Sequence, residues 1–279
     1  MKKILLLDGY NLMYRARYSG MNKGEYSAIF NFFRGLRPLI EKFSPDKAYF
    51  VLEGMPVKRL EADPDYKGQR VYNNKDNFNE QRKEIVRLIS RYFPIQIVRH
   101  NDYECDDVIG YLANTKHSED NVTIISSDTD FIQCINENVA LYNPVRKALI
   151  EKPEYDYILW KSLKGDASDN IEGFKGVGDK KAIKLCESKD LLNKFLDTEE
   201  KKEKLTHNQF MIKLHDLEDD TGIEYYPVPV GCDWPSLKVE FTNMEFNSIV
   251  AKEKTWEKYK NTFKNLEEVG QYAKLEKEG

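Results

Sequence analysis

Residues 4–9 read Ile-Leu-Leu-Leu-Asp-Gly, a short apolar run that ends at an acid and a glycine. Four similar runs, rich in β-branched or aromatic residues and bounded by turn residues, follow at Ala48–Leu52, Ile95–Val98, Val122–Ser126 and Val139–Tyr142. Their length and composition predict buried β-strands. Helical periodicity lies between them, at Tyr26–Phe43, Phe78–Tyr92 and about Glu104–Ala113, the last with Asn101 or Asp102 as its cap. Such alternation is typical of a parallel sheet covered on both faces, so residues 1–150 are predicted to form an α/β domain.

The second half of the chain has a different pattern, because the strand signal fades after Pro153. Helical segments separated by glycines follow, including Gly178–Glu187, and the stretches 198–204 and 222–235 are typical of connections. Near the end, one predicted helix carries apolar side chains at helical spacing that we interpret as a packing face: Trp256, Tyr259, Phe263 and Leu266. Residues 151–279 are therefore predicted to form a helical subdomain packed against the sheet.

The composition limits the class of protein. Of 279 residues, 41% are apolar, which is enough for a sizeable core and excludes a disordered chain. Lys and Arg total 43 against 47 Asp and Glu, and the formal net charge of −4 taken alone argues mildly against a polyanionic partner. The four cysteines are far apart, which argues against a zinc ribbon or a disulfide framework. The first apolar run is too short for a signal peptide, and no run reaches the ~20 residues of a membrane span, so we expect a soluble, cytoplasmic protein.

Carboxylates recur at the predicted strand ends. Asp8 follows the first apolar run, Glu53 follows the second, and Asp128 and Asp130 follow the run that ends at Ser126. In a doubly wound sheet the carboxyl ends of the strands form one rim, where ligands bind. Further acids lie at a predicted helix start and, three residues apart, in a later turn: Glu104, Asp106, Asp107, Asp166 and Asp169.

Each of these acids has an ordinary structural alternative, since Asp after a strand commonly forms a turn or caps a helix. A calcium loop starting at Asp128 is excluded, because it would need Gly at position 133 and Glu at position 139, which are Gln and Val. The convergence of the acids nevertheless favours a site, because carboxylates held together repel one another unless cations neutralise them. Oxygen ligands without His or Cys favour Mg²⁺ or Mn²⁺, and such clusters commonly hold two ions for phosphodiester hydrolysis.

A basic stretch accompanies the acids. From Lys58 to Arg91 the chain carries nine Lys or Arg against six acids, which forms either a solvated surface or a clamp on a phosphate. In the second interpretation Lys67 and Arg70 bind the scissile phosphate, and Tyr66 offers a ring on which a base stacks.

A second basic element is rich in glycine. Residues 173–184 read Gly-Phe-Lys-Gly-Val-Gly-Asp-Lys-Lys-Ala-Ile-Lys. The outer glycine spacing matches a Walker A loop, but Asp179 stands where that loop requires Lys. A glycine hairpin that opens a helix would instead offer backbone N–H groups to a DNA phosphate, and the lysines would add sequence-independent attraction. The candidate DNA-binding residues are therefore Gly173, Lys175, Gly176, Gly178, Lys180, Lys181 and Lys184.

Five segments, in this order, resemble motifs of the 5′ nuclease (flap endonuclease) superfamily. They are Leu-Leu-Asp-Gly-Tyr-Asn-Leu (6–12), Asp-Tyr-Lys-Gly-Gln-Arg (65–70), Tyr-Glu-Cys-Asp-Asp (103–107), Ser-Ser-Asp-Thr-Asp-Phe (126–131), and Lys-Gly-Asp-Ala-Ser-Asp-Asn-Ile followed by Gly-Val-Gly (164–178). The resemblance covers about residues 1–190. It is greatest to stand-alone bacteriophage 5′–3′ exonucleases, also called phage RNase H, and to the 5′ nuclease domain of bacterial DNA polymerase I. Beyond about residue 215 no family motif is identified.

This resemblance implies a PIN-like α/β nuclease core with a mainly parallel sheet, a helical arch at about 58–92, and a helix–three-turn–helix element at about 160–190. It implies that eight of the nine acids named above are metal-site acids, with Glu53 as the candidate for the ninth, and that K⁺ is often bound at the glycine hairpin. It also implies that Tyr66, Lys67 and Arg70 act at the base of the arch. One position departs from the family, because Glu53 stands where Asp is usual.

The implied activity is that of a Mg²⁺-dependent 5′–3′ exonuclease and flap endonuclease of DNA replication. Its substrates would be 5′ flaps, nicked or gapped duplex ends, and RNA primers in RNA–DNA hybrids. The implied partners are DNA and a replication polymerase or single-strand-binding protein, and no membrane is implied. The protein is expected to be a monomer in the cytoplasm, which is the host's cytoplasm if a phage encodes it. Without the nine site acids, 38 acids remain against 43 Lys and Arg, so the charge balance is consistent with a nucleic-acid partner.

Two rival hypotheses remain at the level of sequence. One is a PIN-like ribonuclease that acts on single-stranded RNA, which would need fewer acids and no glycine hairpin. The other is a DNA-junction-binding protein without catalysis, which the complete set of acids argues against.

Overall fold

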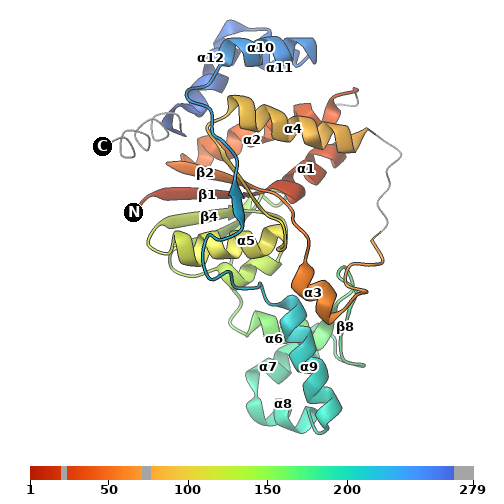
Figure 1. Cartoon of the computed structure of the whole chain (residues 1–279). Coiled ribbons are helices and arrows are strands. Elements are labelled where there is room, and N and C mark those ends of the chain that lie inside the picture. Colours follow the sequence, from red (N-terminus) through yellow and green to blue (C-terminus); the bar gives the residue numbers. More distant parts are fainter. Residues whose placement is uncertain (20–23, 71–76, 267–279) are drawn as a thin grey trace.

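In the computed structural model, which describes residues 1–19, 24–70 and 77–266, a seven-stranded sheet crosses the middle of the molecule (Figure 1). The strand order is β6-β5-β4-β1-β2-β3-β9. The strands span Lys3–Asp8 (β1), Lys47–Val51 (β2), Gln96–His100 (β3), Asn121–Ile125 (β4), Val139–Asn143 (β5), Ala148–Ile150 (β6) and Ile223–Tyr225 (β9). Strands β1 to β5 pair in parallel, and β6 and β9 close the two edges in antiparallel orientation. The five strands predicted from apolar runs and the mainly parallel sheet are confirmed.

The order of the strands creates a crevice beside β1. The chain adds β2 and β3 on one side of β1, and then returns to add β4 and β5 on the other side. At such a reversal of strand order, the connections diverge and leave a crevice outside the carboxyl ends of the strands. Leu7 is in register with Ile125, so the residues that follow them, Asp8 and Ser126, lie side by side at the crevice.

Alternation along β1 divides the apolar core into two layers. Leu5 and Leu7 belong to the layer that packs with α1 (Gly9–Tyr18), α2 (Ser27–Phe43) and α4 (Phe78–Tyr92). Ile4 and Leu6 belong to the layer that packs with α5 (Cys105–Tyr111) and the π-helical turn Leu112–Lys116. Figure 1 shows the two groups of helices on opposite sides of the sheet. Helices at 26–43 and 78–92 are thus confirmed.

The start of α5 differs from the prediction. Glu104 is the N-cap, rather than Asn101 or Asp102, and its side chain forms a capping box with Asp107. The reciprocal bonds of a capping box satisfy two backbone N–H groups that would otherwise lack partners, which fixes the start of the helix here.

A second group of helices lies at the lower end of the molecule in Figure 1. α6 (Tyr157–Lys164), α7 (Asp179–Glu187), α8 (Lys189–Phe195) and α9 (Glu199–Ile212) surround a small apolar cluster of their own. A two-stranded ribbon, β7 (Gly165–Asp166) with β8 (Ile171–Glu172), follows α6, and the short helix α3 (Val57–Ala62) contacts α9. This unit contains the predicted helix 178–187.

The chain then returns to the sheet, which differs from the expectation that residues 151–279 form one helical subdomain. β9 adds an edge strand beside β3, within a stretch expected to be a connection. Three helices follow, α10 (Trp234–Asn243), α11 (Asn247–Val250) and α12 (Glu253–Thr262), and α10 contacts α4 while α12 contacts α2. The ring centroids of Phe33 and Phe241 are 5.3 Å apart. The predicted packing face of the last helix is confirmed, since its four side chains are buried.

Two expectations concern the chain as a whole. The division into domains at residue 150 stays a prediction. None of the helices in the described part of the chain combines the length and the apolarity that crossing a membrane requires.

Candidate active site

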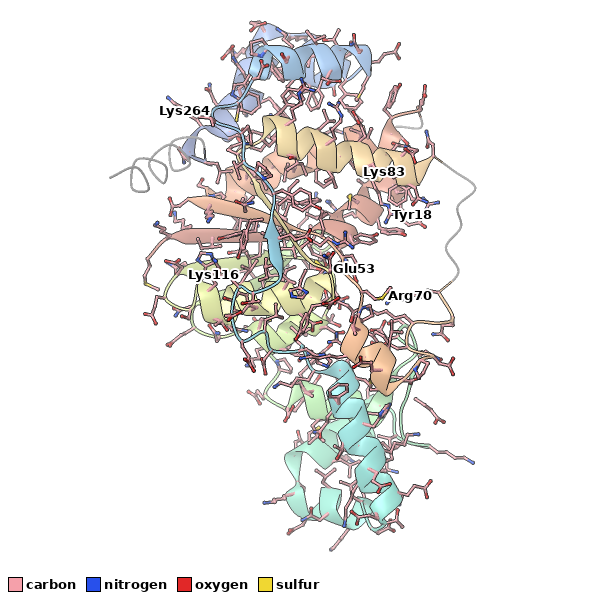
Figure 2. All side chains as sticks on the ribbon, viewed as in Figure 1. Tyr18, Glu53, Arg70, Lys83, Lys116 and Lys264 are labelled. Carbon is pink, nitrogen blue, oxygen red and sulfur yellow. The ribbon has the colours of Figure 1, made fainter. Side chains whose placement is uncertain are left out.

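The crevice beside β1 opens into a cleft of about 910 Å³ whose lining is rich in charge. Seven of the nine acids singled out from the sequence line it: Asp8, Glu53, Asp106, Asp128, Asp130, Asp166 and Asp169. They come from the ends of β1, β2 and β4, from the first turn of α5, and from β7 and the turn after it. In Figure 2, Tyr18 lies above Glu53 and Arg70 lies below it, and all three side chains line this cleft. The sheet topology therefore gathers acids that are far apart in the sequence.

Asp8 has the ordinary capping role that its position suggested, and it also lines the cleft. It caps α1, because its Oδ1 atom accepts a hydrogen bond from the backbone N–H of Asn11 at 3.0 Å. Its Oδ2 atom accepts a hydrogen bond from the Ser126 hydroxyl at 2.7 Å. Burial outweighs these bonds and raises the pKa of Asp8 from 3.8 to about 6.

The pKa values of Glu53 and Asp106 are raised, like that of Asp8. Burial raises the pKa of Glu53 from 4.5 to about 7, and the nearby Glu104 carboxylate adds to this effect. Burial, followed by the negative charge of Asp128, raises the pKa of Asp106 well above its usual value. Acids whose charge is disfavoured by burial and by one another would be stabilised as carboxylates by a bound cation.

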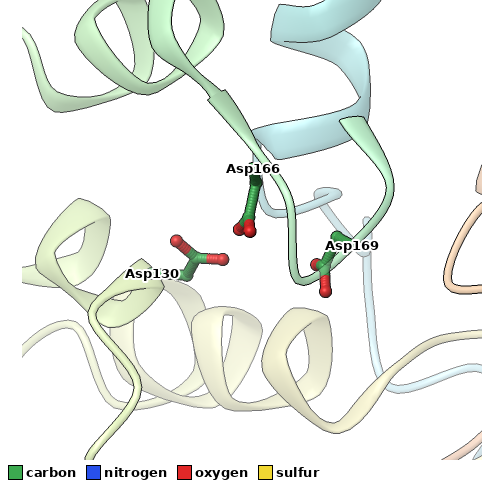
Figure 3. A group of neighbouring side chains, drawn as sticks. All are labelled: Asp130, Asp166 and Asp169. Atoms are coloured by element: carbon green, nitrogen blue, oxygen red, sulfur yellow. The ribbon is translucent and has the colours of Figure 1, made fainter. Parts of the chain in front are cut away.

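Within the same cleft, Asp130, Asp166 and Asp169 point toward one another (Figure 3). One carboxylate oxygen from each lies within 4.8 Å of the others, a spacing at which they could hold a metal ion. The Lys161 ammonium group forms ion pairs with Asp130 and with Asp166, the second at 2.6 Å. Burial raises the pKa of Asp130 to about 6 despite this pair. For Asp166, hydrogen bonds from Lys161 and Ser168 outweigh burial and lower the pKa.

Lys161 is a site residue that the sequence reasoning missed. Its side chain is buried and lines the cleft together with Tyr157, Trp160 and Lys164 of the same helix. The signal that could have revealed it is this isolated Lys in the stretch Tyr-Ile-Leu-Trp-Lys-Ser-Leu (157–163), because a Lys is rarely buried without a paired acid.

Lys67 and Arg70 lie in the cleft, as predicted. The Lys67 ammonium group pairs with Glu104 and lies 3.8 Å from Oδ2 of Asp169. The Arg70 guanidinium group lies 2.5 Å from Oδ1 of Asp169. Both cations therefore approach the acidic cluster from the segment predicted to form the arch, whose residues 71–76 lie outside the described part of the chain.

Tyr66 does not have the position that base stacking requires. Only 5% of its surface is exposed, and its ring packs in a small cluster with Ile171 and Met211. Its hydroxyl group donates to Glu104 at 3.1 Å. Tyr66 therefore orients Glu104 rather than offering an aromatic face, and the prediction of a stacking role for it is wrong.

Glu104 and Asp107 lie behind the cleft, where they bind Arg59. One Arg59 nitrogen, Nη1, is 2.7 Å from both Glu104 and Asp107, and the other, Nη2, is 2.9 Å from Asp107. The same guanidinium group donates to the backbone carbonyls of Met211 and Lys213. Asp107 also accepts a bond from the backbone N–H of residue 215 at 2.7 Å, so its oxygens are fully engaged. We therefore place Asp107 among the structural acids rather than the metal-site acids.

The cleft also contains aromatic side chains that the sequence reasoning did not single out. Tyr10, Tyr14 and Tyr18 follow one another every four residues along α1, and all three line the cleft. Spacing of this kind places side chains on one face of a helix, so the pattern is visible in the sequence.

The glycine hairpin lies outside the cleft, before α7. Gly176 has a φ of +74°, and Gly178 is the N-cap of α7. Gly173 is needed for a different reason, since a Cβ atom there would lie 1.9 Å from the backbone oxygen of Lys164. The lysines at 175, 180, 181 and 184 are exposed around this hairpin. Their role in binding DNA stays a prediction.

The fold is shared with two solved nuclease structures. A crystal structure of the bacteriophage T5 flap endonuclease, a pseudo-enzyme-product complex with DNA and metal ions, matches 97% of this chain and 100% of that chain, with a TM-score of 0.64 and 19% identity. Human GEN1 in complex with Holliday junction DNA matches 95% of this chain and 71% of that chain, with a TM-score of 0.54 and 16% identity. These likenesses confirm the PIN-like α/β fold.

Sequence comparison defines the class of protein. The family described as "5'-3' exonuclease, N-terminal resolvase-like domain" matches residues 3–158. A 5′–3′ exonuclease of Aquifex aeolicus is 30% identical over 280 residues, covering 90% of this chain and 94% of the relative. The chain belongs to the 5′–3′ exonuclease family, whose members are phosphodiester hydrolases.

A further relative is DNA polymerase I of Lactococcus lactis subsp. cremoris, which is 31% identical over 215 residues. The match covers 66% of this chain but only 24% of the polymerase. The likeness therefore concerns about a quarter of that longer protein.

Proposed function

We propose that this protein is a Mg²⁺-dependent, structure-selective 5′ nuclease that hydrolyses phosphodiesters of 5′ flaps, duplex 5′ ends and RNA primers. The observation that carries the proposal is the cleft, which is lined by seven carboxylates and by five cationic side chains, Arg17, Lys67, Arg70, Lys161 and Lys164. Membership of the 5′–3′ exonuclease family supports the same reaction.

The donor set fits divalent magnesium or manganese. The lining offers carboxylate oxygens, which suit these hard cations, and within the described residues no His or Cys lines the cleft. Asp130, Asp166 and Asp169 would hold one ion, and the buried acids Asp8 and Asp106, with Asp128 and Glu53, would hold another. When bound, two such ions activate a water molecule and stabilise the attacking and leaving oxygens of the phosphodiester.

The cationic side chains of the cleft would act on two different groups, the scissile phosphate and the metal-site acids. Lys67 and Arg70 would bind the non-bridging oxygens of the scissile phosphate, where charge develops during the reaction. Lys161 would favour the charged forms of Asp130 and Asp166 and hold the two carboxylates close together.

DNA would be held through its backbone, at the glycine hairpin before α7. The exposed lysines at 175, 180, 181 and 184 would supply attraction that does not depend on sequence. The similar T5 and GEN1 structures are complexes with DNA, which supports DNA as the partner. K⁺ at the hairpin, a monomeric state, and a polymerase or single-strand-binding partner stay predictions from the family resemblance.

A magnesium-dependent cleavage assay tests the proposal. We expect the purified protein to cut a 5′ flap in Mg²⁺ and not in EDTA, and the Asp128→Asn/Asp130→Asn variant to lose this activity. Asp190→Asn, which changes an exposed acid on α8, is the matched control and should cut like the wild type. Failure of the wild type to cut flaps, preferential cutting of single-stranded RNA, or full activity of the double variant would refute the proposal.

A further inference from the structure

A second pocket, of about 640 Å³, lies across one wall of the acidic cleft. Tyr10 and Glu53 line both the cleft and this pocket, so they form the wall between the two. The remaining lining comes largely from α4 and includes three cationic residues, Arg82, Lys83 and Arg99, together with Glu80, which forms an ion pair with Lys83. Figure 2 labels Lys83 and Glu53, which mark two sides of the pocket.

Arg99 occupies a position at which an apolar side chain would be expected. It follows Ile97 by two residues on β3, and Ile97 faces the apolar layer beneath α4. The Nε atom of Arg99 is buried and has no hydrogen-bond partner, and no carboxylate of the described residues pairs with its guanidinium group. A guanidinium group stays charged at any physiological pH, so it cannot relieve this state by losing a proton.

Arg82, on helix α4, also has a buried Nε atom without a hydrogen-bond partner. Its Nη2 atom donates to Asn79 at 2.6 Å, and its guanidinium carbon lies 4.8 Å from the centre of the Tyr10 ring. In the described chain no acid forms an ion pair with it. The pocket therefore has two arginine donors that lack an acceptor, beside an aromatic wall.

We propose that Arg82 and Arg99 bind a backbone phosphate of the single strand that extends past the acidic cleft. Tyr10 lies in the wall between the cleft and this pocket. The inference rests on the proposed nuclease function. A phosphate would neutralise the charge of the two arginines, and a guanidinium group matches phosphate geometry. Lys83 is paired with Glu80 in this pocket, whereas the two arginines are not paired with a carboxylate of the described residues and can bind a phosphate.

A purely structural role for these arginines predicts a different effect on stability. A structural arginine loses bonds when it is replaced, as Arg59 would, whereas a buried cation without a partner weakens the fold. Without nucleic acid, we expect the melting temperature of Arg99→Gln to equal or exceed that of the wild type, and that of Arg82→Gln to fall only slightly, because it loses the bond to Asn79 and the contact with Tyr10.

Binding is measured by fluorescence anisotropy with Ca²⁺ in place of Mg²⁺, on one duplex junction made with and without a single-stranded 5′ flap. For the flap substrate, we expect each variant to bind about tenfold more weakly, because one charge-assisted hydrogen bond to phosphate is removed. The dependence of log affinity on log salt should fall by about 0.7 for each phosphate that the variant no longer binds. For the substrate without a flap, binding should be unchanged. Arg91→Gln, which removes an exposed charge from the same helix, is the control and should bind both substrates like the wild type.

Three outcomes would overturn the inference: equal weakening for both substrates, no weakening for either, or a fall in melting temperature that accounts for the weakening. Inorganic phosphate provides a further arm. If it stabilises the wild type but not Arg99→Gln, and the flap has no effect, the pocket binds free phosphate and the nucleic-acid assignment is wrong. Cleavage by the wild type is scored separately, so failure of the nuclease proposal is distinguishable from failure of this one.

Discussion

Replacing Arg59 by Met should damage the fold more than most single changes in this chain. Arg59 is 3% exposed and joins three parts of the structure: α3, the start of α5, and the end of α9. Met has a similar length and is apolar, so the change removes the charge and the hydrogen bonds while largely preserving the volume. It leaves Asp107 buried without its counter-ion, while Glu104 keeps its ion pair with Lys67.

The magnitude follows from these interactions. Removing one partner of a buried ion pair costs about 3–5 kcal/mol, because the other charge remains buried. The carbonyl groups of Met211 and Lys213 also lose a donor, at roughly 1 kcal/mol each. We therefore expect a loss of about 5 kcal/mol in the free energy of unfolding, which is equivalent to a fall of roughly 10–20 °C in melting temperature for a chain of this size.

Urea unfolding, followed by circular dichroism, measures this loss. Arg37→Met is the matched control, since it removes the same side chain from a surface pair with Glu41, and should cost less than about 1 kcal/mol. Adding Asp107→Leu to Arg59→Met should recover part of the loss, because it removes a stranded carboxylate. A cost for Arg59→Met no larger than that of the control, or no recovery in the double variant, would refute this account of the buried pair.

Three further predictions concern the cleft and the hairpin. Because burial raises the pKa of Asp8 from 3.8 to about 6, the folded state retains a proton that the unfolded state has lost in this window. The free energy of unfolding should therefore fall as pH rises from about 4 to 6 in EDTA, and urea titrations should show a smaller fall with Mg²⁺. Lys161→Met removes a cation that competes for Asp130, so Mn²⁺ should bind several-fold more tightly by electron paramagnetic resonance; weaker binding would contradict the competition. Gly176→Ala should cost about 1 kcal/mol, the strain of its positive φ, whereas Gly173→Ala should cost more in the same urea assay because its Cβ would meet a carbonyl oxygen.

The central fold could be predicted because its strands are short apolar runs that end at polar residues. The run 4–7 became β1, and the acid after it came to the strand end, where parallel topology places ligands. β9 could not be predicted in the same way. It has three residues, Ile223, Glu224 and Tyr225, of which one is buried, and its pairing with β3 depends on tertiary structure.

The candidate site was recoverable to the extent that its residues lie within local motifs. Asp128 and Asp130 follow a strand, and their motif is contiguous, so their position could be inferred. The difference between Asp106 and Asp107 could not be inferred, because adjacent residues at a helix start point in different directions and only the fold supplies Arg59. Tyr66 was misread for a related reason, since the sequence does not show that its ring is enclosed by residues more than a hundred positions away.

The edge strand β9 has a consequence for how the protein can be divided. The recognisable motifs end by about residue 190, yet the segment 223–266 covers the open edge of β3 and the apolar surfaces of α2 and α4. A fragment that stops after the motifs would expose unpaired strand groups next to bare aromatic rings, a combination that promotes association between copies. The smallest piece of this chain that folds should therefore be larger than the piece that carries the chemistry, and fusions that borrow this nuclease need the helices at its end.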